Sequence, residues 1–209
     1  MQELKQESKG NDMRFKIFDL YETEGIVIED IALKNVINLN PKLALKSHGR
    51  NVQKFGQTKV NIVERLINRL GVAGHRGRKH KVMVGRASGK YSKNAKIVLE
   101  AFKIIQDKTK KNPIEVFVKA IENAAPRDEI TTIEYGGARY PQAVDVSPLR
   151  RVNIALRNLV HGGSDKAFNK KKSFSRGVAE EIIFASEGNQ ESFALKKKME
   201  SERQADSAR

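Results

Sequence analysis

Residues 127–160 read RDEITTIEYGGARYPQAVDVSPLRRVNIALRNLV, and they carry the clearest structural signals in the chain. Its first half contains two runs of β-branched and aromatic residues that are separated by Gly136 and Gly137. Two such runs joined by a two-residue glycine turn predict a β-hairpin over about 127–146. Pro141 has no N–H to donate to a ladder, so the second strand should be exposed along at least one edge.

The second half of the stretch changes to a helical period. Ser147-Pro148 is a helix start signal, and Leu149, Val152, Leu156 and Leu159 form one apolar stripe, with Gly162-Gly163 as the expected end. No further strand pattern lies nearby. Because an isolated two-stranded ribbon is marginal in water, we expect the hairpin to project from a helical body and to be stabilised by a ligand surface.

Helices are also expected on both sides of this stretch. Upstream, Asp30 is the expected cap of a short helix, and Thr58 is the expected cap of a helix that ends at Gly71. A further helix is expected over about 93–109. Asn112-Pro113 predicts the start of another helix, which ends at Pro126. The 93–109 segment is apolar around most of its girth, which predicts the central core helix. Downstream, helices are expected over about 174–185 and from a cap at Asn189 to about 208.

These elements predict a mainly α fold: a bundle of about six helices with a protruding two-stranded β-hairpin. Residues 1–14 are polar and mixed in charge, and we expect a disordered tail there. Residues 15–209 are expected to form a single helical domain.

The charge of the chain indicates a polyanionic partner. The net charge is +15, and the interval between Asp30 and Glu100 holds sixteen Lys or Arg but one acid, Glu64. The densest part is the glycine-containing loop 74–81, and further clusters stand at Lys170–Lys172 with Arg176 and at Lys196–Lys198. Solubility needs only about 2–8 charges, so nucleic acid is the better explanation.

No pattern in the sequence supports catalysis. The chain has no cysteine, and residues 85–91 depart from a phosphate-binding loop in spacing and in the residue after Lys90. The four histidines lack ligand spacing, so no metal site and no cofactor is expected. Asp128 and Glu129 are neighbours on a strand and face opposite sides, which favours solvation or the orientation of nearby arginines over a carboxylate dyad. No signal peptide or membrane span is present in the sequence, which predicts a cytoplasmic protein.

Several segments together carry a family resemblance. Glu134 to Val160, Asn61-Ile-Val-Glu-Arg-Leu, Ala101-Phe-Lys-Ile-Ile, Asn112-Pro-Ile-Glu-Val-Phe and Ala194 to Arg203 resemble the universal small-subunit ribosomal protein seven family in order and spacing. The resemblance covers about residues 26–209. The lead over 15–56 is similar to the archaeal and eukaryotic branch, and its shortness favours an archaeal source.

The resemblance implies a structural constituent of the small ribosomal subunit that is no enzyme. Members bind the 3′ major (head) domain of the ribosomal RNA and help nucleate head assembly. Their ribbon lies near the messenger exit and the exit-site transfer RNA. The implied partners are therefore ribosomal RNA, messenger and transfer RNA, and neighbouring small-subunit proteins. No membrane contact and no homo-oligomer is expected.

Two sets of candidate contact residues follow from the basic clusters and from the resemblance. The first, for ribosomal RNA, is Lys46, Arg50, Lys54, Arg76, Arg78, Lys79, His80, Lys81, Arg86, Lys90, Lys170, Lys171, Lys172 and Arg176. The second, at the hairpin and close to messenger and transfer RNA, is Arg127, Tyr135, Gly136, Gly137, Arg139, Tyr140, Arg150 and Arg151.

Two other classes of protein remain as alternatives. A DNA-packaging or architectural protein with a basic arm also has a high pI and a projecting ribbon. A more distant alternative is an RNA-processing enzyme that uses Asp128 or Glu129. Binding to random duplex DNA as strong as binding to ribosomal RNA would favour the first, and an RNA cleavage activity would favour the second.

Overall fold

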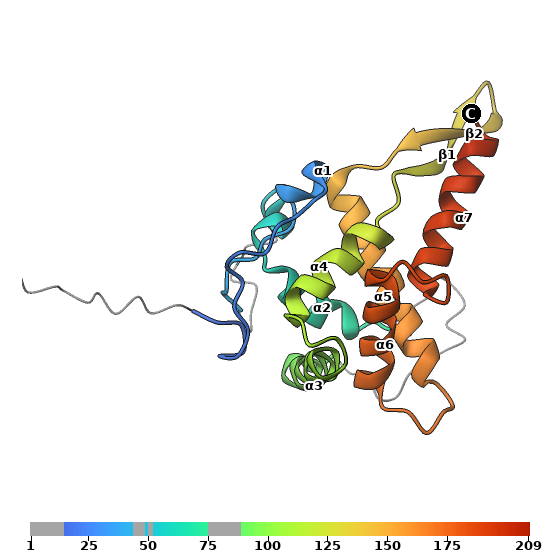
Figure 1. Cartoon of the computed structure of the whole chain (residues 1–209). Helices are drawn as coiled ribbons and strands as arrows, with labels where there is room; N and C mark the ends of the chain where they lie inside the picture. The colour runs from blue at the N-terminus through green and yellow to red at the C-terminus, as the bar shows by residue number, and fades with distance from the viewer. Residues whose placement is uncertain (1–14, 44–48, 50–51, 75–88) are drawn as a thin grey trace, which may run out of the picture.

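The computed structural model describes residues 15–43, 49, 52–74 and 89–209 (Figure 1). Within these residues the elements are α1 (Ile31–Lys34), the short 3₁₀ helix η1 (Gly56–Lys59), α2 (Ile62–Leu70), α3 (Tyr91–Thr109), α4 (Pro113–Ala124), β1 (Asp128–Tyr135), β2 (Ala138–Asp145), α5 (Pro148–Ala167), α6 (Phe174–Ser186) and α7 (Phe193–Ser207). The predicted mainly α fold with one β-hairpin is confirmed. The tail predicted over 1–14 lies outside the described residues.

Two of the predicted helix starts are confirmed by their capping bonds. Asp30 precedes α1, and its Oδ1 accepts the backbone N–H of Ala32 at 2.9 Å. Asn112 precedes α4 in the same way, with its Oδ1 accepting from Ile114 at 3.0 Å and Pro113 at the first helical position. Both side chains satisfy an N–H that has no partner inside the helix, which is why these residue types favour the position.

Two other predicted caps are wrong. The cap of α2 is Asn61, whose Oδ1 accepts from Val63 at 2.8 Å, whereas Thr58 lies in η1 and donates its hydroxyl to the Phe55 carbonyl. The cap of α7 is Ser192, and Asn189 instead closes the turn before the helix. Polar side chains in short turns make the same local bonds as caps, so sequence alone placed both starts about three residues early.

The central helix is α5 and not the predicted 93–109 helix. α5 packs against α1, α2, α4, α6 and α7, whereas α3 packs against α2, α4 and α6 and lies at one end of the body (Figure 1). α3 buries one stripe, while Ile97, Leu99 and Ile104 are only partly covered. A helix that is apolar around most of its circumference can be buried on all sides, but the number of neighbouring helices determines how much of its surface is buried.

α5 also continues through Gly162 and Gly163, where the sequence predicted its end. A Cβ at Gly162 would stand 2.6 Å from the Glu181 side chain, and one at Gly163 would stand 2.8 Å from the backbone of Val178. On α6, a Cβ at Gly177 would meet the carbonyl oxygen of Gly163. These glycines therefore permit α5 and α6 to cross closely, and they keep ordinary helical geometry instead of terminating the helix.

The hydrophobic core extends from the N-terminal lead to α7. Ile17 and Tyr21 form an isolated β-bridge across a tight turn, and both are buried. The Tyr21 ring meets the Phe102 ring edge-on at 5.9 Å, and Phe102 lies 6.0 Å from Phe117. The lead is thus held on the α3–α4 side of the body by aromatic contacts.

Candidate nucleic-acid interface

The ribbon formed by β1 and β2 has the predicted turn. The strands pair antiparallel from Asp128 opposite Asp145 to Tyr135 opposite Ala138. Gly136 and Gly137 connect them with φ values of 59° and 80°. Positive φ at both central residues is the turn that matches strand twist, and glycine adopts it without steric cost.

The base of the ribbon packs against α7, a contact that the sequence did not predict. α7 runs beside the strands and brings the C-terminus to them (Figure 1). Ser201 donates its hydroxyl to the Asp128 carbonyl at 3.2 Å, and the Arg209 guanidinium reaches the Asp128 carboxylate at 2.8 Å. Glu202 accepts the backbone N–H of Arg127 at 3.0 Å. The protein itself therefore stabilises the base of the ribbon, in addition to any stabilisation by the ligand surface that we expected from the sequence.

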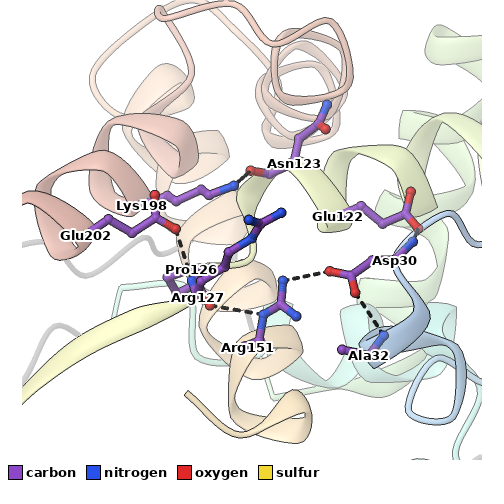
Figure 2. Close-up of polar contacts among 9 residues, drawn as sticks. All are labelled: Asp30, Ala32, Glu122, Asn123, Pro126, Arg127, Arg151, Lys198 and Glu202. Carbon is purple, nitrogen blue, oxygen red and sulfur yellow. Dashed lines mark hydrogen bonds and ion pairs between the residues drawn. The ribbon is translucent and has the colours of Figure 1, made fainter. Parts of the chain in front are cut away.

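Arg150 and Arg151 are adjacent at the start of α5 but have different environments. Arg150 is exposed and makes a two-point contact with Glu129, with Nη2 2.8 Å from Oε2, and this bond raises the pKa of Arg150. Arg151 is only 7% exposed. Its Nε donates to the Pro126 carbonyl at 3.1 Å and its Nη2 reaches Asp30 at 2.7 Å (Figure 2). Arg151 thus joins the body to the ribbon base and offers little surface to a ligand.

The polar network around Arg151 connects four segments that are distant in the sequence. Burial is the largest single influence on the pKa of Asp30 and raises it, but the hydrogen bonds from Arg151 and from the backbone of Ala32, with the charges of Arg151 and Arg127, together hold that pKa below its ordinary value. The backbone N–H of Asp30 donates to Glu122 at 3.1 Å, and Lys198 donates to the Asn123 carbonyl at 2.9 Å (Figure 2). Burial lowers the pKa of Lys198. α1, α4, α5 and α7 therefore meet where the ribbon begins.

The outer half of the ribbon is exposed and not basic. Over 127–146 there are four acids and two arginines, Arg127 and Arg139. One face of the ribbon carries Ile133, Tyr135 and Tyr140, because Ile133 pairs with Tyr140 and Tyr135 lies two residues after Ile133. These side chains are 45%, 82% and 58% exposed, respectively. Arg139 lies 3.5 Å from Glu134 at the surface. This face offers aromatic and apolar groups to a ligand, with little net charge.

A cleft of about 250 Å³ between α2 and α5 contains two arginines, with a third nearby. Arg65 is buried, donates to the Val36 carbonyl and to Asn153, and has a pKa lowered to about 10 by that burial. Arg69 has a pKa lowered by burial and then by the charge of the exposed Arg157. Its Nε is buried and finds no hydrogen-bond acceptor among the described residues. We call Arg65, Arg69 and Arg157 the arginine cleft, and it is suited to an anion.

The arginine cleft was missed by the sequence-based prediction of contacts. The signal existed in part, since Arg65 and Arg69 stand four residues apart and so share a helix face. The approach of Arg157, which lies 88 residues after Arg69 in the sequence, depends on the packing of α2 against α5. Tertiary contacts alone bring these three charges together.

The predicted lysine cluster lies at the turn between α5 and α6 and is partly neutralised. Glu180 contacts Lys172 at 2.6 Å and Arg176 at 3.3 Å. Burial is the largest single influence on the pKa of Glu180 and raises it, but the hydrogen bonds and charges of Lys172 and Arg176, with the charge of Lys108, together lower that pKa. Lys170 and Lys171 are exposed and pair with no acid among the described residues. These two lysines are therefore the members most available to a phosphate.

The remaining candidates are dispersed or lie outside the described residues. Lys54 is exposed and lies over the Phe55 ring, 5.4 Å from its centroid, and Lys90 is exposed at the start of α3. Arg127 is exposed beside the ribbon base. Eight candidates have no described placement and stay predictions: Lys46, Arg50, Arg76, Arg78, Lys79, His80, Lys81 and Arg86.

The carboxylates considered for catalysis are engaged in ion pairs. Asp128 contacts Arg209 and Glu129 contacts Arg150, in agreement with the expectation that they orient arginines. Among the described residues no group of His, Cys, Asp or Glu is arranged to hold a metal ion. No helix in the described part of the chain is long and apolar enough to cross a membrane.

These features define a class: a strongly basic, mainly helical protein with a projecting ribbon and arginine-rich surfaces suited to a polyanion. Residues 33–209 match the model of the family described as ribosomal protein S7p/S5e. The chain is 48% identical over 198 residues to small ribosomal subunit protein uS7 of Nanoarchaeum equitans, with 94% of this chain and 100% of that protein covered.

Other archaeal relatives give the same result. Identity is 42% over 197 residues to uS7 of Methanosphaera stadtmanae and 43% over 200 residues to uS7 of Methanococcus maripaludis, again with 94% of this chain and 100% of each relative covered. The chain belongs to the ribosomal protein S7p/S5e family. Membership confirms the predictions of a small-subunit ribosomal protein that is no enzyme, of an archaeal relationship, and of a ribosomal location in the cytoplasm.

Proposed function

We propose that this protein binds the 3′ major (head) domain of small-subunit ribosomal RNA and helps nucleate assembly of the head. The arginine cleft is the observation that carries the proposal. Arg65 and Arg69 of α2 line one cleft, Arg157 of α5 is near enough for its charge to lower the pKa of Arg69, and the Nε of Arg69 has no acceptor among the described residues. A phosphate in the cleft would accept from Arg69 and relieve its repulsion by Arg157.

Further exposed lysines in the described part of the chain extend this contact beyond the cleft. Lys54, Lys90, Lys170 and Lys171 are exposed on different parts of the body. Several separate basic faces suit a folded RNA that surrounds the protein, whereas a duplex binder needs one face. This distribution, together with the family membership, favours ribosomal RNA over the DNA-packaging alternative.

The ribbon is proposed to work by a second kind of contact, near the messenger exit and the exit-site transfer RNA. Its exposed Tyr135 and Tyr140 can stack on unpaired bases, and its surplus of acids makes phosphate neutralisation a minor contribution. The side chain of Arg139 near the tip is 75% exposed, whereas Arg151 is only 7% exposed and offers little surface to a ligand. The ribbon should therefore contribute affinity that depends little on salt.

The test is a filter-binding titration at several salt concentrations, with a head-domain RNA transcript and with random duplex DNA of equal length. The full chain should bind the RNA more tightly at moderate salt. Equal affinity for the two would refute the ribosomal proposal and favour a DNA-packaging role.

The contribution of the arginine cleft can be measured in the same titration. Replacing Arg69 and Arg157 together with Ala should lower the slope of log affinity against log salt by about one unit for each phosphate that the variant no longer binds. The matched control, Lys93→Ala with Lys103→Ala, removes two exposed charges from α3 that belong to none of the named basic clusters. If both double variants changed the slope equally, the cleft would be no specific phosphate site.

A further inference from the structure

A second pocket, of about 440 Å³, lies between η1 and the start of α5, next to the arginine cleft. Its walls are mostly apolar and include Val36, Phe55, Pro148 and Leu149. We call it the Phe55 pocket. Its volume lies within the range of about 300–1,000 Å³ that is usual for small-molecule sites. A space of this size and lining can hold one planar ring group.

The backbone around Phe55 holds its ring at the surface. The residue is large and apolar but 62% exposed, and its φ of 61° lies in the left-handed region that bulky residues rarely adopt. The Phe55 carbonyl accepts the Thr58 N–H at 3.0 Å and the Thr58 hydroxyl at 2.8 Å, and the N–H of Gly56 donates to Gln53 at 2.9 Å. Residues held in such conformations occur frequently where ligands bind. The exposed ring is therefore a contact surface of the pocket.

Asn153 lies on the boundary between the two cavities, because it lines both the Phe55 pocket and the arginine cleft. Its Oδ1 accepts from Nη2 of Arg65 at 3.1 Å, and its Nδ2 donates to Gln57 at 3.2 Å. These bonds fix the side chain that the cavities share. An apolar pocket and an anion site are therefore neighbours on α5.

The charges around both cavities favour an anion after existing ion pairs are discounted. Among the described residues, no acid lines either cavity, and the two arginines in the lining of the cleft form no ion pair. Arg150 is the one cation in the lining of the Phe55 pocket, and it is already paired with Glu129. Lys54 lies 5.4 Å from the centroid of the Phe55 ring. The occupant should therefore combine an apolar ring with a nearby negative charge.

An unpaired nucleotide of RNA has both of these parts. We propose that the Phe55 pocket seats an unpaired base, which stacks on the Phe55 ring while an adjacent phosphate of the same strand occupies the arginine cleft. Ser147 lines the pocket, is exposed and makes no capping bond, so its hydroxyl can bond the edge of the base. This inference rests on the proposed function and adds a site for one base to it.

The first test compares two fluorescein-labelled RNA strands of about eight nucleotides by anisotropy titration with the full chain. One strand is all uridine, and the other has the same ribose-phosphate backbone without bases. Phe55→Ala should weaken binding of the uridine strand about tenfold and that of the abasic strand by less than about twofold, because only the first strand can stack. The cleft variant, Arg69→Ala with Arg157→Ala, should weaken both strands. Unchanged affinity of Phe55→Ala for the uridine strand, or equal losses for the two strands, would overturn the proposal.

Matched variants separate stacking in the pocket from a general apolar effect. Phe15→Ala removes a phenylalanine that is 73% exposed and lies outside the pocket lining, and it should leave both affinities within about twofold. Phe55→Tyr keeps the ring and should bind the uridine strand like the unchanged protein, whereas Phe55→Leu should lose nearly as much as Phe55→Ala. Full affinity in Phe55→Leu would show that an apolar side chain of another protein fits the pocket as well as a base, and would overturn the proposal.

The ribbon also offers rings to a single strand, so its contribution has to be removed. In a protein that carries Tyr135→Ala and Tyr140→Ala, the additional change Phe55→Ala should still weaken the uridine strand about tenfold. Disappearance of the loss in this background would assign the stacking to the ribbon and would refute the pocket.

The failure of this inference can be distinguished from failure of the proposed function. In the salt titration with the head-domain transcript, Phe55→Ala should bind more weakly than the unchanged protein but with the same salt slope, because no charge has been removed. If the unchanged protein showed no preference for the transcript over duplex DNA, the proposed function would fail. If the unchanged protein kept that preference and Phe55→Ala bound the transcript and the uridine strand with undiminished affinity, only the base site would be refuted.

Discussion

The base and the outer half of the ribbon belong to one hairpin but are stabilised in different ways. The base contacts α7, and the adjoining residues Pro126 and Arg127 are bonded to Arg151 and Glu202. The outer half has its own ladder and the Gly136-Gly137 turn, and its side chains are exposed. Tertiary contacts thus fix the direction of the ribbon, and local turn chemistry fixes its tip. A rigid base can present an adaptable tip to a ligand.

The largest effect is expected from breaking the base of the ribbon. Arg151→Ala leaves the Asp30 carboxylate and the Pro126 carbonyl without their shared donor. We expect a loss of about 3 kcal/mol in the free energy of unfolding, as for other broken and mostly buried ion pairs. Urea denaturation followed by circular dichroism measures it.

The adjacent arginine provides the control for this prediction. Arg150→Ala removes an exposed ion pair with Glu129 and should cost less than about 1 kcal/mol. Equal losses in the two variants would contradict the difference that we infer between neighbouring residues.

A somewhat smaller loss in the free energy of unfolding is expected when the packing of α6 against α5 is disturbed. Gly177→Ala places a Cβ against the Gly163 carbonyl, so α6 must move away from α5, the helix that carries Arg151. We expect about 2 kcal/mol of destabilisation from overpacking. Gly89→Ala is the control, because a Cβ there meets nothing within 4 Å. Similar unfolding midpoints for the two variants would show that the crossing can relax.

The outer half should change binding and leave stability intact. Tyr135→Ala with Tyr140→Ala removes two exposed rings, so the free energy of unfolding should stay nearly constant. Affinity for a single-stranded RNA should fall about tenfold, at the lower end of what stacking contributes. The salt slope should not change, in contrast to the arginine cleft variant. A changed slope would mean that the ribbon works through phosphates.

The smallest effect is expected when the pH is lowered, and it tests the role of Asp30. Its pKa in the folded protein is held below the ordinary value of 3.8, so its pairing with Arg151 stabilises the protein fully above about pH 4. That contribution should disappear as the pH falls through the lowered pKa, by about 1 kcal/mol. Unfolding of the unchanged protein and of Asp30→Asn, measured between about pH 3 and 6, should give curves that converge toward low pH. Parallel curves would disprove the assignment.

Local signals predicted the elements whose determinants lie close together in the sequence. The caps at Asp30 and Asn112 and the turn at Gly136-Gly137 depend on hydrogen bonds or φ angles within a few residues. The helix end expected at Gly162-Gly163 was wrong because those glycines serve a contact with α6. Glycine signals both a helix end and a close approach, and only the neighbouring element distinguishes the two.

The candidate site also has features that local sequence predicts and features that depend on tertiary contacts. The charge surplus, the basic clusters and the ribbon were evident from the residues, and the family resemblance supplied the ribosomal assignment. The neutralisation of Lys172 and Arg176 by Glu180 was not evident, although Arg176 and Glu180 are only four residues apart. Counting cations overestimates a binding surface because the count does not show which charges are already paired.

The class of fold, the ribbon with its turn and the basic character could be predicted from the residues without a structure, as could the lack of a catalytic pattern. These follow from local conformational preferences and from composition, which need no knowledge of neighbours. Three features became clear from the packing of the helices: α5 is central, α7 supports the ribbon, and Arg151 is buried beside an exposed Arg150. Burial and charge pairing depend on residues far apart along the chain, and packing alone brings them together.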